Sequence, residues 1–279
     1  MADNTTLMHA INAIATQAGE EIMAVYRQAG ALQVINKQDA SPLTEADTRA
    51  NTLICKALQA LTPRLPIISE ESALAPFSTR RQWQEYWLVD PLDGTREFIN
   101  RNGEFTVNIA LIRGGVPVLG VIHAPVTQNS WMGLAGYGAW KRVGEQALLP
   151  IRTRVLGDKL LHKSLRVLGS RHHGNTALQK LLARAAGQFG GLDLLPMGSS
   201  LKFCAIAEGS ADLYVRFGPT CEWDTAAAQV ILEAAGGKLL RTDFSALTYN
   251  HKESLLNPPF IAFGDAGQDW SRILGSLQA

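Results

Sequence analysis

The sequence predicts an α/β protein built from two parts, an α+β part over residues 1–150 and an α/β part over residues 151–279. In the first part, two helical patterns precede a series of strands joined by short turns, which favours a mostly antiparallel sheet. In the second part, strand and helix patterns alternate, as they do in α/β proteins. Residues 145–163 fit neither rhythm and carry clustered charges, so we expect the boundary between the parts there.

Two amphipathic helices are expected near the N-terminus. The first, capped by Asp3 or Asn4, carries apolar residues at helical spacing, namely Leu7, Ile11, Ile14, Ala18, Ile22 and Val25. After a strand at Val34–Lys37 and a polar loop, the second helix should begin at Asp47 and end before Pro63. Asp47 is either a helix cap alone or an acid that belongs to a functional site.

The antiparallel sheet should combine one short strand with two hairpins. The short apolar strand at 66–69 leads directly to two acidic residues, Glu70 and Glu71. Glycines mark the tight turns of the hairpins, as is common where two strands reverse direction. The paired strands are expected at Phe105–Arg113 with Val116–His123, and at Trp131–Ala135 with Ala139–Val143.

The strand that begins at Trp87 carries the feature on which we base the functional interpretation. It runs into two aspartates three residues apart, Asp90 and Asp93, and we expect Pro91 and Gly94 to break it so that both carboxylates face a cleft. Two carboxylates this close repel each other unless a cation lies between them. Hard divalent cations prefer oxygen ligands, so the segment predicts a magnesium site for phosphate chemistry.

The second part should alternate strands with helices. Strands are expected at Leu165–Leu168, Leu192–Leu195, Asp212–Phe217, Lys238–Arg241 and Phe260–Phe263. Helices are expected at Asn175–Gln188, Leu201–Glu208 and Asp224–Ala235, with a further helix at the C-terminus. Two glycines follow the third of these helices, and glycine is the usual residue just beyond a helix end.

Composition narrows the possible partners and compartments. The chain has 279 residues, of which 46% are hydrophobic and 18% charged, as in ordinary globular proteins. A net charge of +1 without a basic stripe argues against a nucleic-acid polymer as partner. Three widely spaced cysteines form neither a metal motif nor a disulfide pattern, which fits a reducing compartment.

The sequence also bears on location. No apolar run approaches the ~18 residues of a membrane span, and the N-terminus lacks the features of a secretory signal. We therefore expect a cytoplasmic protein that acts on a small molecule. Peripheral attachment to the cytoplasmic side of the inner membrane stays open, as does the choice between a monomer and a homodimer.

Four short segments combine acidic, small and basic residues, namely Glu70-Glu71, Asp90–Thr95, Gly198–Lys202 and Glu222–Ala227. Asp90-Pro-Leu-Asp-Gly-Thr95 together with Trp223-Asp224-Thr-Ala-Ala resembles the paired signatures of the inositol monophosphatase superfamily of lithium-sensitive, magnesium-dependent phosphatases. Both signatures occur in the right order, and the resemblance spans essentially the whole chain. It implies the layered sugar-phosphatase fold.

Three further segments are similar to the CysQ-type 3′(2′),5′-bisphosphate nucleotidases within this superfamily. They are Thr95–Ile112, Gly198–Cys204 and Tyr214–Thr220. Inositol phosphatases usually have an Asn-Phe-type segment after the Asp-Gly-Thr, whereas this chain has Arg96-Glu97-Phe98. The resemblance implies removal of the 3′-phosphate of adenosine 3′,5′-bisphosphate, giving AMP and phosphate and clearing a by-product of sulfate assimilation.

The resemblance also implies roles for individual residues. Two Mg²⁺ ions, and in some members a third, would bind to Glu70, Asp90, Asp93, Asp224 and the backbone carbonyl of Leu92. The catalytic water would be served by Glu70, Thr95 and Asp47. The substrate-binding positions would be Asp93, Gly94, Thr95, Gly198, Ser199, Lys202 and Asp224.

Several alternatives stay open. An inositol monophosphatase, a broad sugar phosphatase or an NADP(H) 2′-phosphatase would use the same scaffold, and a non-catalytic nucleotide-binding regulator is an alternative of another class. For Lys202 the alternative is a solvated helix residue, and for Arg216 and Glu222 it is pairing with another charge. His172 and His173 are expected in a loop, because the implied mechanism needs no imidazole.

Overall fold

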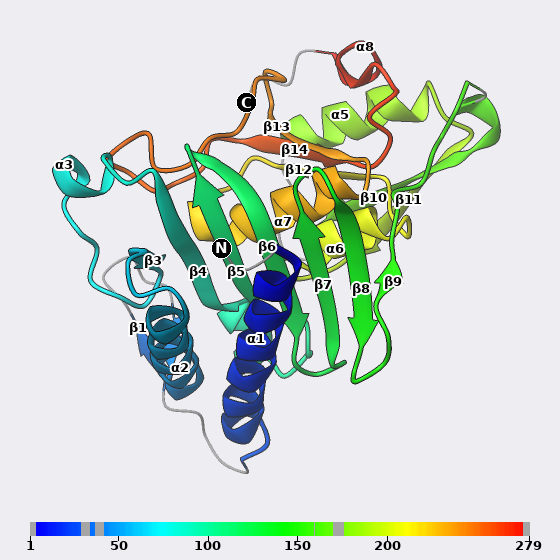
Figure 1. The fold of residues 1–279 in the computed structure, drawn as a ribbon. Coiled ribbons are helices and arrows are strands. Elements are labelled where there is room, and N and C mark those ends of the chain that lie inside the picture. Colours follow the sequence, from blue (N-terminus) through cyan, green and yellow to red (C-terminus); the bar gives the residue numbers. More distant parts are fainter. Residues whose placement is uncertain (1–3, 29–33, 37–41, 159, 170–175, 276–279) are drawn as a thin grey trace.

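The structure, a computed structural model, describes residues 4–28, 34–36, 42–158, 160–169 and 176–275. Within these residues the chain forms five alternating layers of helices and sheets (Figure 1). A seven-stranded and a five-stranded sheet each contain parallel and antiparallel strand pairs. The layered α/β class expected from the sequence is therefore confirmed.

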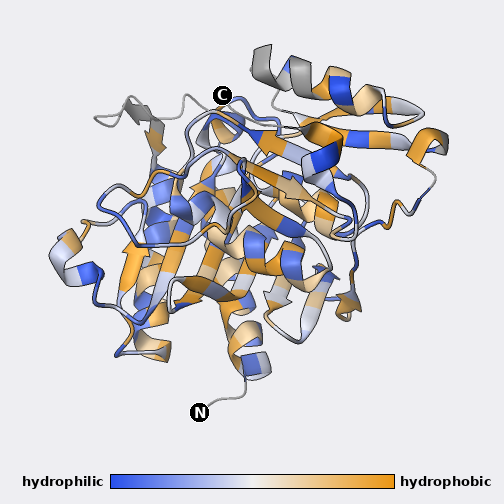
Figure 2. Cartoon of the chain, turned by 90° about the horizontal axis from the view of Figure 1, so that it is seen from above, coloured by the Kyte–Doolittle hydropathy of each residue, from blue (hydrophilic) through white to orange (hydrophobic). Residues whose placement is uncertain are grey.

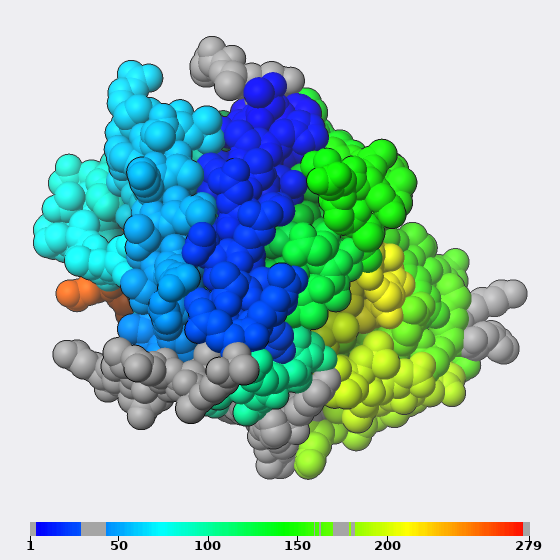
Figure 3. Space-filling model, turned by 90° about the horizontal axis from the view of Figure 1, so that it is seen from below, coloured from blue at the N-terminus to red at the C-terminus, as the bar shows by residue number. Residues whose placement is uncertain are grey.

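Helices α1 (Asn4–Tyr26) and α2 (Glu45–Leu61) form the first layer. They lie side by side over one face of the seven-stranded sheet (Figure 1, Figure 3). The predicted apolar stripe of α1 packs into the core beneath them, through Ile11, Ile14, Ala18, Ile22 and Val25. The prediction that α2 begins at Asp47 is wrong by two residues, because Thr44 is its N-cap and Asp47 its third residue.

The seven-stranded sheet follows the order β3, β4, β5, β6, β7, β8, β9. Its strands are β3 (Ile67–Ser69), β4 (Glu85–Asp93), β5 (Thr106–Arg113), β6 (Val116–Ala124), β7 (Asn129–Leu134), β8 (Gly138–Val143) and β9 (Leu149–Pro150). β3 pairs with β4 in parallel, and the pairs from β4 to β9 are antiparallel. A small separate sheet pairs β1 (Val34–Asn36) with β2 (Pro42–Thr44). Lys37 and the Asp3 cap lie outside the described residues.

Strand β4 continues through Pro91 to Asp93, so the expectation that Pro91 breaks it is wrong. The strand instead contains a β-bulge. Asp90 pairs with Asn108 and Asp93 pairs with Thr106, so β4 has one more residue in this interval than β5. A bulge interrupts the hydrogen-bond ladder, which accommodates a proline, and it changes the direction of the side chains beside it.

Helices α6 (Leu201–Ala207) and α7 (Glu222–Ala234) fill the layer between the two sheets. α7 begins two residues before its predicted start at Asp224. It lies so close to the seven-stranded sheet that two strand positions require glycine. A Cβ atom at Gly120 would lie 2.5 Å from the carbonyl oxygen of Ala227, and one at Gly133 would lie 2.6 Å from Cα of Ile231.

The five-stranded sheet has the order β11, β10, β12, β14, β13. Its strands are β10 (Ser164–Gly169), β11 (Gly191–Pro196), β12 (Leu213–Arg216), β13 (Lys238–Arg241) and β14 (Phe260–Phe263). Helices α5 (Thr176–Ala186) and α8 (Trp270–Leu274) form the last layer and share a hydrophobic core with this sheet (Figure 1). The predicted strand–helix alternation of the second part is thus present, with Asn175 outside the described residues.

The predicted boundary falls between the strands of the two sheets, because β9 ends at Pro150 and β10 begins at Ser164. The core between the sheets is nevertheless shared, since it joins Leu88 of the first part to Tyr214 and Ala227 of the second. Figure 2 shows apolar residues along the strands of both sheets, as expected when each sheet lies between other layers. The division into two domains stays a prediction.

The remaining helical segments are short, and they are α3 (Phe77–Arg80), α4 (Thr95–Ile99) and the 3-10 turn η1 (Leu160–His162). In the part of the chain that the structure describes, no helix combines the length and the apolar composition needed to cross a membrane.

We expect Gly133→Ala to lower the free energy of unfolding by about 1–3 kcal/mol, the usual cost of overpacking a core. The added Cβ would meet backbone atoms of α7 at 2.6–2.9 Å, and no side-chain rotation relieves such contacts. Urea unfolding followed by circular dichroism measures the change. Gly169→Ala is the control, because nothing lies within 4 Å of its Cβ position. Equal stability of the two variants would contradict the close packing of α7.

Candidate active site

Asp90 and Asp93 lie at the bulged end of β4. The side chain of Asp90 is buried, and its Oδ1 accepts a hydrogen bond from the N–H of Leu92 at 3.0 Å. The Oδ2 atom of Asp93 accepts the N–H of Ser200 at 2.5 Å. Gly94 follows with a φ of 97°, a left-handed conformation that glycine tolerates best. The two carboxylates are therefore held at the strand end by backbone geometry.

At this strand end, the pKa of Asp90 is affected by burial and by the charges of neighbouring acids. Burial raises the pKa of Asp90 well above its ordinary range. Four neighbouring carboxyl groups raise it further, and in decreasing order of effect they are Glu70, Asp93, Asp224 and Asp47. Glu70 follows β3, and its backbone N–H donates to the carbonyl of Val89 on β4 at 3.2 Å. The ends of β3 and β4 therefore bring their acids side by side.

Asp224 joins this acid cluster (Glu70, Asp90, Asp93, Asp224 and Asp47) from the second half of the chain. It is the third residue of α7, and its Oδ2 accepts the N–H of Cys221 at 2.8 Å in a capping box. Its carboxyl group lies close enough to that of Asp90 for its negative charge to raise the pKa of Asp90. Burial, and then the charge of Asp93, raise the pKa of Asp224 well above its ordinary range.

Thr95 and Asp47 meet beside the other acids. The Oγ1 atom of Thr95 lies 3.4 Å from Oδ1 of Asp47 and 3.4 Å from the carbonyl oxygen of Leu92. The second oxygen of Asp47 accepts the N–H and the hydroxyl of Thr44, at 2.8 and 2.6 Å. Asp47 thus closes the capping box of α2 and also contacts Thr95, so a cap role alone does not describe it.

Ser200 and Asn108 link the two halves of the site, and the sequence analysis missed both. The hydroxyl of Ser200 donates to the backbone carbonyl of Asp224 at 3.0 Å and accepts Nδ2 of Asn108 at 2.9 Å. Its N–H also holds Asp93. A signal existed for each residue. Ser200 lies inside the predicted segment Gly198–Lys202, and Asn108 is the polar residue in the stretch Val107–Ile112, whose other residues are apolar.

Gly198 and Ser199 form the turn before α6. The N–H of Gly198 donates to Oε2 of Glu104 at 2.7 Å, and a Cβ atom here would lie 2.7 Å from Cγ of Glu97. Ser199 has a φ of 47°, which is uncommon for a residue other than glycine. The loop after α4 therefore fixes this turn beside the acid cluster.

Lys202 is buried in the first turn of α6. Its Nζ donates to the carbonyls of Met197 and Ser199, at 3.3 and 2.8 Å. Burial is the main reason that the pKa of Lys202 is lowered to about 8. The negative charge of Asp93 raises this pKa, and the positive charge of Arg216 lowers it further. The alternative that Lys202 is a solvated helix residue is therefore wrong.

Glu222 is buried and paired, as its alternative interpretation holds. Its carboxylate accepts the N–H of Asn250 at 2.7 Å and the ammonium group of Lys252 at 3.4 Å. His172 and His173 lie outside the described residues.

The donors at this site suit Mg²⁺, which prefers carboxylate and carbonyl oxygens. A cation beside the buried Asp90 would also relieve repulsion from its neighbours. Among the described residues, no three acidic, histidine or cysteine side chains enclose a metal position by themselves. Mg²⁺ commonly retains water and shares oxygens of a substrate phosphate, so an incomplete protein shell is compatible with it.

The chain belongs to the inositol monophosphatase family, whose sequence pattern matches residues 3–267. The 3′(2′),5′-bisphosphate nucleotidase CysQ of Salmonella typhimurium is 46% identical over 248 residues, which cover 88% of this chain and 95% of that protein. CysQ of Haemophilus influenzae is 37% identical over 270 residues, covering 97% of each chain. The crystal structure of CysQ from Bacteroides thetaiotaomicron matches with a TM-score of 0.80 at 38% identity, covering 93% of this chain and 97% of that one. The resemblance found in the sequence is confirmed.

We expect Ser200→Ala to lower the free energy of unfolding by about 1–3 kcal/mol, because the buried amide of Asn108 loses a well-placed acceptor. Urea unfolding measures the loss. Ser199→Ala is the matched control, since its hydroxyl oxygen accepts a weak 3.4 Å hydrogen bond from the N–H of Leu201. A Ser200→Ala protein as stable as the control would show that this network does not hold the two halves of the site.

Proposed function

We propose that this protein is a magnesium-dependent 3′(2′),5′-bisphosphate nucleotidase, which removes the 3′-phosphate of adenosine 3′,5′-bisphosphate and releases AMP and phosphate. The observation that carries the proposal is the 46% identity to a Salmonella typhimurium protein of that name, with 95% of that protein covered. The acid cluster supports it independently, because phosphate-ester hydrolysis requires positive charge at the reacting phosphate.

In this proposal, five groups supply oxygen ligands to two Mg²⁺ ions, and they are Glu70, Asp90, Asp93, Asp224 and the carbonyl of Leu92. A third, weaker ion near Glu70 is a further hypothesis. When bound, Mg²⁺ neutralises charge on the phosphate oxygens and lowers the pKa of the attacking water. The electrostatic coupling of Asp90 to Glu70, Asp93 and Asp224 supports this ligand set.

Thr95 and Glu70 orient the water that attacks phosphorus. The hydroxyl of Thr95 has a single proton, and its donation to Asp47 leaves the oxygen lone pairs available to accept a hydrogen bond from water. Oδ1 of Asp47 lies 3.4 Å from this hydroxyl oxygen and is the acceptor in our proposal, because the carbonyl of Leu92, at the same distance, is assigned to Mg²⁺. The water oxygen then bonds to phosphorus and the water gives up one proton, while the bond from phosphorus to O3′ breaks. O3′ takes up one proton from solvent, so one proton is released and one is consumed.

The substrate phosphates would meet backbone and side-chain donors on both sides of the acid cluster. The N–H groups of Gly94 and Thr95 are suited to the reacting phosphate, and Gly198 and Ser199 form the neighbouring turn. Asp93 and Asp224 complete the set of residues that we assign to substrate contact. The left-handed backbone at Gly94 and Ser199 supports this assignment. In such a conformation, successive backbone N–H groups can point toward the same anion.

Lys202 and Arg216 are the groups that we assign to the second phosphate of the substrate. Their charges are close enough that Arg216 lowers the pKa of Lys202, and Asp93 lies within the same range. Two adjacent cations favour a second anionic group, and a monophosphate has none. This pair therefore favours a bisphosphate over inositol monophosphate.

The alternatives are less well supported. The names of the relatives favour the nucleotidase over an inositol monophosphatase, a broad sugar phosphatase or an NADP(H) phosphatase. The complete acid cluster argues against a non-catalytic regulator. We further propose a cytoplasmic enzyme, monomeric or homodimeric, that clears a by-product of sulfate assimilation and also accepts the 3′-phosphosulfate relative of its substrate. Peripheral membrane attachment is not part of the proposal.

The purified protein with Mg²⁺ should hydrolyse adenosine 3′,5′-bisphosphate with a kcat/KM at least about tenfold above those for inositol 1-phosphate and NADP⁺. Released phosphate is the measurement, and millimolar Li⁺ should inhibit the reaction. Chelation of Mg²⁺ should abolish it. A wide preference for inositol 1-phosphate would overturn the substrate assignment, and insensitivity to Li⁺ would count against the family mechanism.

Asp93→Asn should reduce Mg²⁺-dependent hydrolysis by at least about 100-fold, because the amide keeps an acceptor for the N–H of Ser200 but loses the charge that binds the cation. An unchanged circular-dichroism spectrum should show that the fold is retained. The exposed Asp243 serves as control, and Asp243→Asn should leave activity unchanged. Full residual activity of Asp93→Asn would refute its assignment as a metal ligand.

A further inference from the structure

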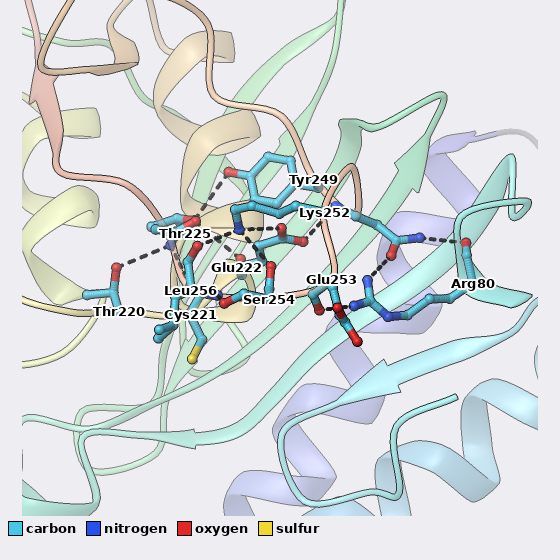
Figure 4. Close-up of polar contacts among 12 residues, drawn as sticks. Arg80, Thr220, Cys221, Glu222, Thr225, Tyr249, Lys252, Glu253, Ser254 and Leu256 are labelled. Carbon is cyan, nitrogen blue, oxygen red and sulfur yellow. Dashed lines mark hydrogen bonds and ion pairs between the residues drawn. The ribbon is translucent and has the colours of Figure 1, made fainter. Parts of the chain in front are cut away.

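Glu222 opens α7 with a buried carboxylate that the proposed reaction does not use. Its side chain is 1% exposed. Oε2 accepts the backbone N–H of Asn250 at 2.7 Å, and Oε1 accepts Nζ of Lys252 at 3.4 Å. Figure 4 shows this carboxylate facing the loop that contains Tyr249 and Lys252. The first turn of α7 is thus attached to the 249–257 loop.

Asn250 continues the connection to the first half of the chain. Its Nδ2 donates to the carbonyl of Arg80 at 2.7 Å, and its Oδ1 accepts Nη1 of the same arginine. Arg80 is 1% exposed, and its Nη2 donates to the carbonyl of Glu253 (Figure 4). Asn250 has a φ of 58°, a conformation that asparagine adopts more readily than most residues. The buried Arg80 and the positive φ of Asn250 therefore both contribute to the contact between these two residues.

Backbone hydrogen bonds reinforce the same attachment. The N–H of Glu222 donates to the carbonyl of Leu255 at 2.8 Å. The side-chain amide of Asn257 donates to the carbonyl of Cys221 at 2.6 Å. The loop therefore contacts the start of α7 on both sides of Glu222, and Asp224 lies on this same helical turn.

One end of the connection lies on the segment between Glu70 and β4, and the other lies on α7, the helix of Asp224. Arg80 ends α3, which lies between Glu70 and β4, the strand of Asp90. Glu222 lies two residues before Asp224 on α7. A continuous path of hydrogen bonds through the backbone and side chain of Asn250 thus joins the segment that leads into β4 to the start of α7, without passing through the acid cluster.

We propose that Glu222 is a positioning residue that fixes Asp224 relative to Asp90 through Asn250 and Arg80. Burying the carboxylate of Glu222 costs desolvation free energy. Its ion-pair partner Lys252 is 44% exposed, so solvent weakens the attraction between the two charges. The helix also needs no further cap, because Cys221 and Asp224 already form the capping box. The inference rests on the proposed function, in which Asp224 binds Mg²⁺.

Two variants test the positioning role. Glu222→Gln keeps the side-chain size and removes the charge, whereas Asn250→Gly tolerates the positive φ and removes the contact with Arg80. In both we expect the half-saturating Mg²⁺ concentration to rise about tenfold, as for other residues that orient metal ligands. It is measured from hydrolysis of adenosine 3′,5′-bisphosphate and, without turnover, from the Mg²⁺-induced rise in melting temperature. KM at saturating Mg²⁺ should stay at the wild-type value.

Asp212→Asn is the control for general destabilisation. Asp212 is also a buried carboxylate, paired with Arg154 at 3.0 Å, but it belongs to neither α7 nor β4. We expect it to lower the melting temperature and leave the Mg²⁺ dependence unchanged. A wild-type Mg²⁺ dependence in both test variants, or an equal shift in Asp212→Asn, would overturn the positioning role. A wild-type protein that Mg²⁺ neither activates nor stabilises would instead overturn the proposed function.

Discussion

Repulsion between the buried carboxylate of Asp90 and its acidic neighbours is the constraint on which the rest of this structure depends. Asp90 is buried beside other acids, which is costly unless the scaffold holds them in place and a cation balances them. The chain meets the first requirement with hydrogen bonds to the aspartates of the cluster. Asp93 accepts from Ser200, Asp224 accepts from Cys221, and Asp47 accepts from Thr44. Asp47 and Asp224 are thus anchored by the caps of their own helices, and Asp93 by the turn before α6, so the site is where these elements meet.

The packing of α7 sets how closely those elements meet. The helix lies between the two sheets, and the backbones of Ala227 and Ile231 approach Gly120 and Gly133 too closely for any side chain at those positions. Asp224 is therefore brought to β4 by contacts along the whole helix, and the Glu222–Asn250–Arg80 path adds a second restraint at its first turn. Stability of the middle layer and geometry of the site are consequently linked, because α7 packs between the sheets and also carries Asp224.

Three elements differ from their sequence-based prediction, and each difference has a local physical cause. Cysteine is a rare N-cap, so Asp224 was predicted as the start of α7 although it is the third residue and Cys221 is the cap. Asp47 was misplaced in the same way, because the capping box makes an acid at the third position resemble a cap. Pro91 was read as a strand break, whereas a β-bulge keeps the strand and changes the direction of its side chains. In each case the acid was found and its place in the element was not.

The sequence by itself determined the helices, the strands and the acids, because hydrophobic period, glycine turns and the Asp-Pro-Leu-Asp-Gly-Thr segment are local patterns. Only the tertiary structure decided the partners of those acids. Ser200 with Asn108, and Glu222 with Asn250, are contacts between distant segments that no local pattern specifies. Burial was likewise decided by packing. Lys202 lies on a short helix of ordinary sequence, and it is the enclosure of that helix between two sheets that removes its solvent and lowers its pKa to about 8.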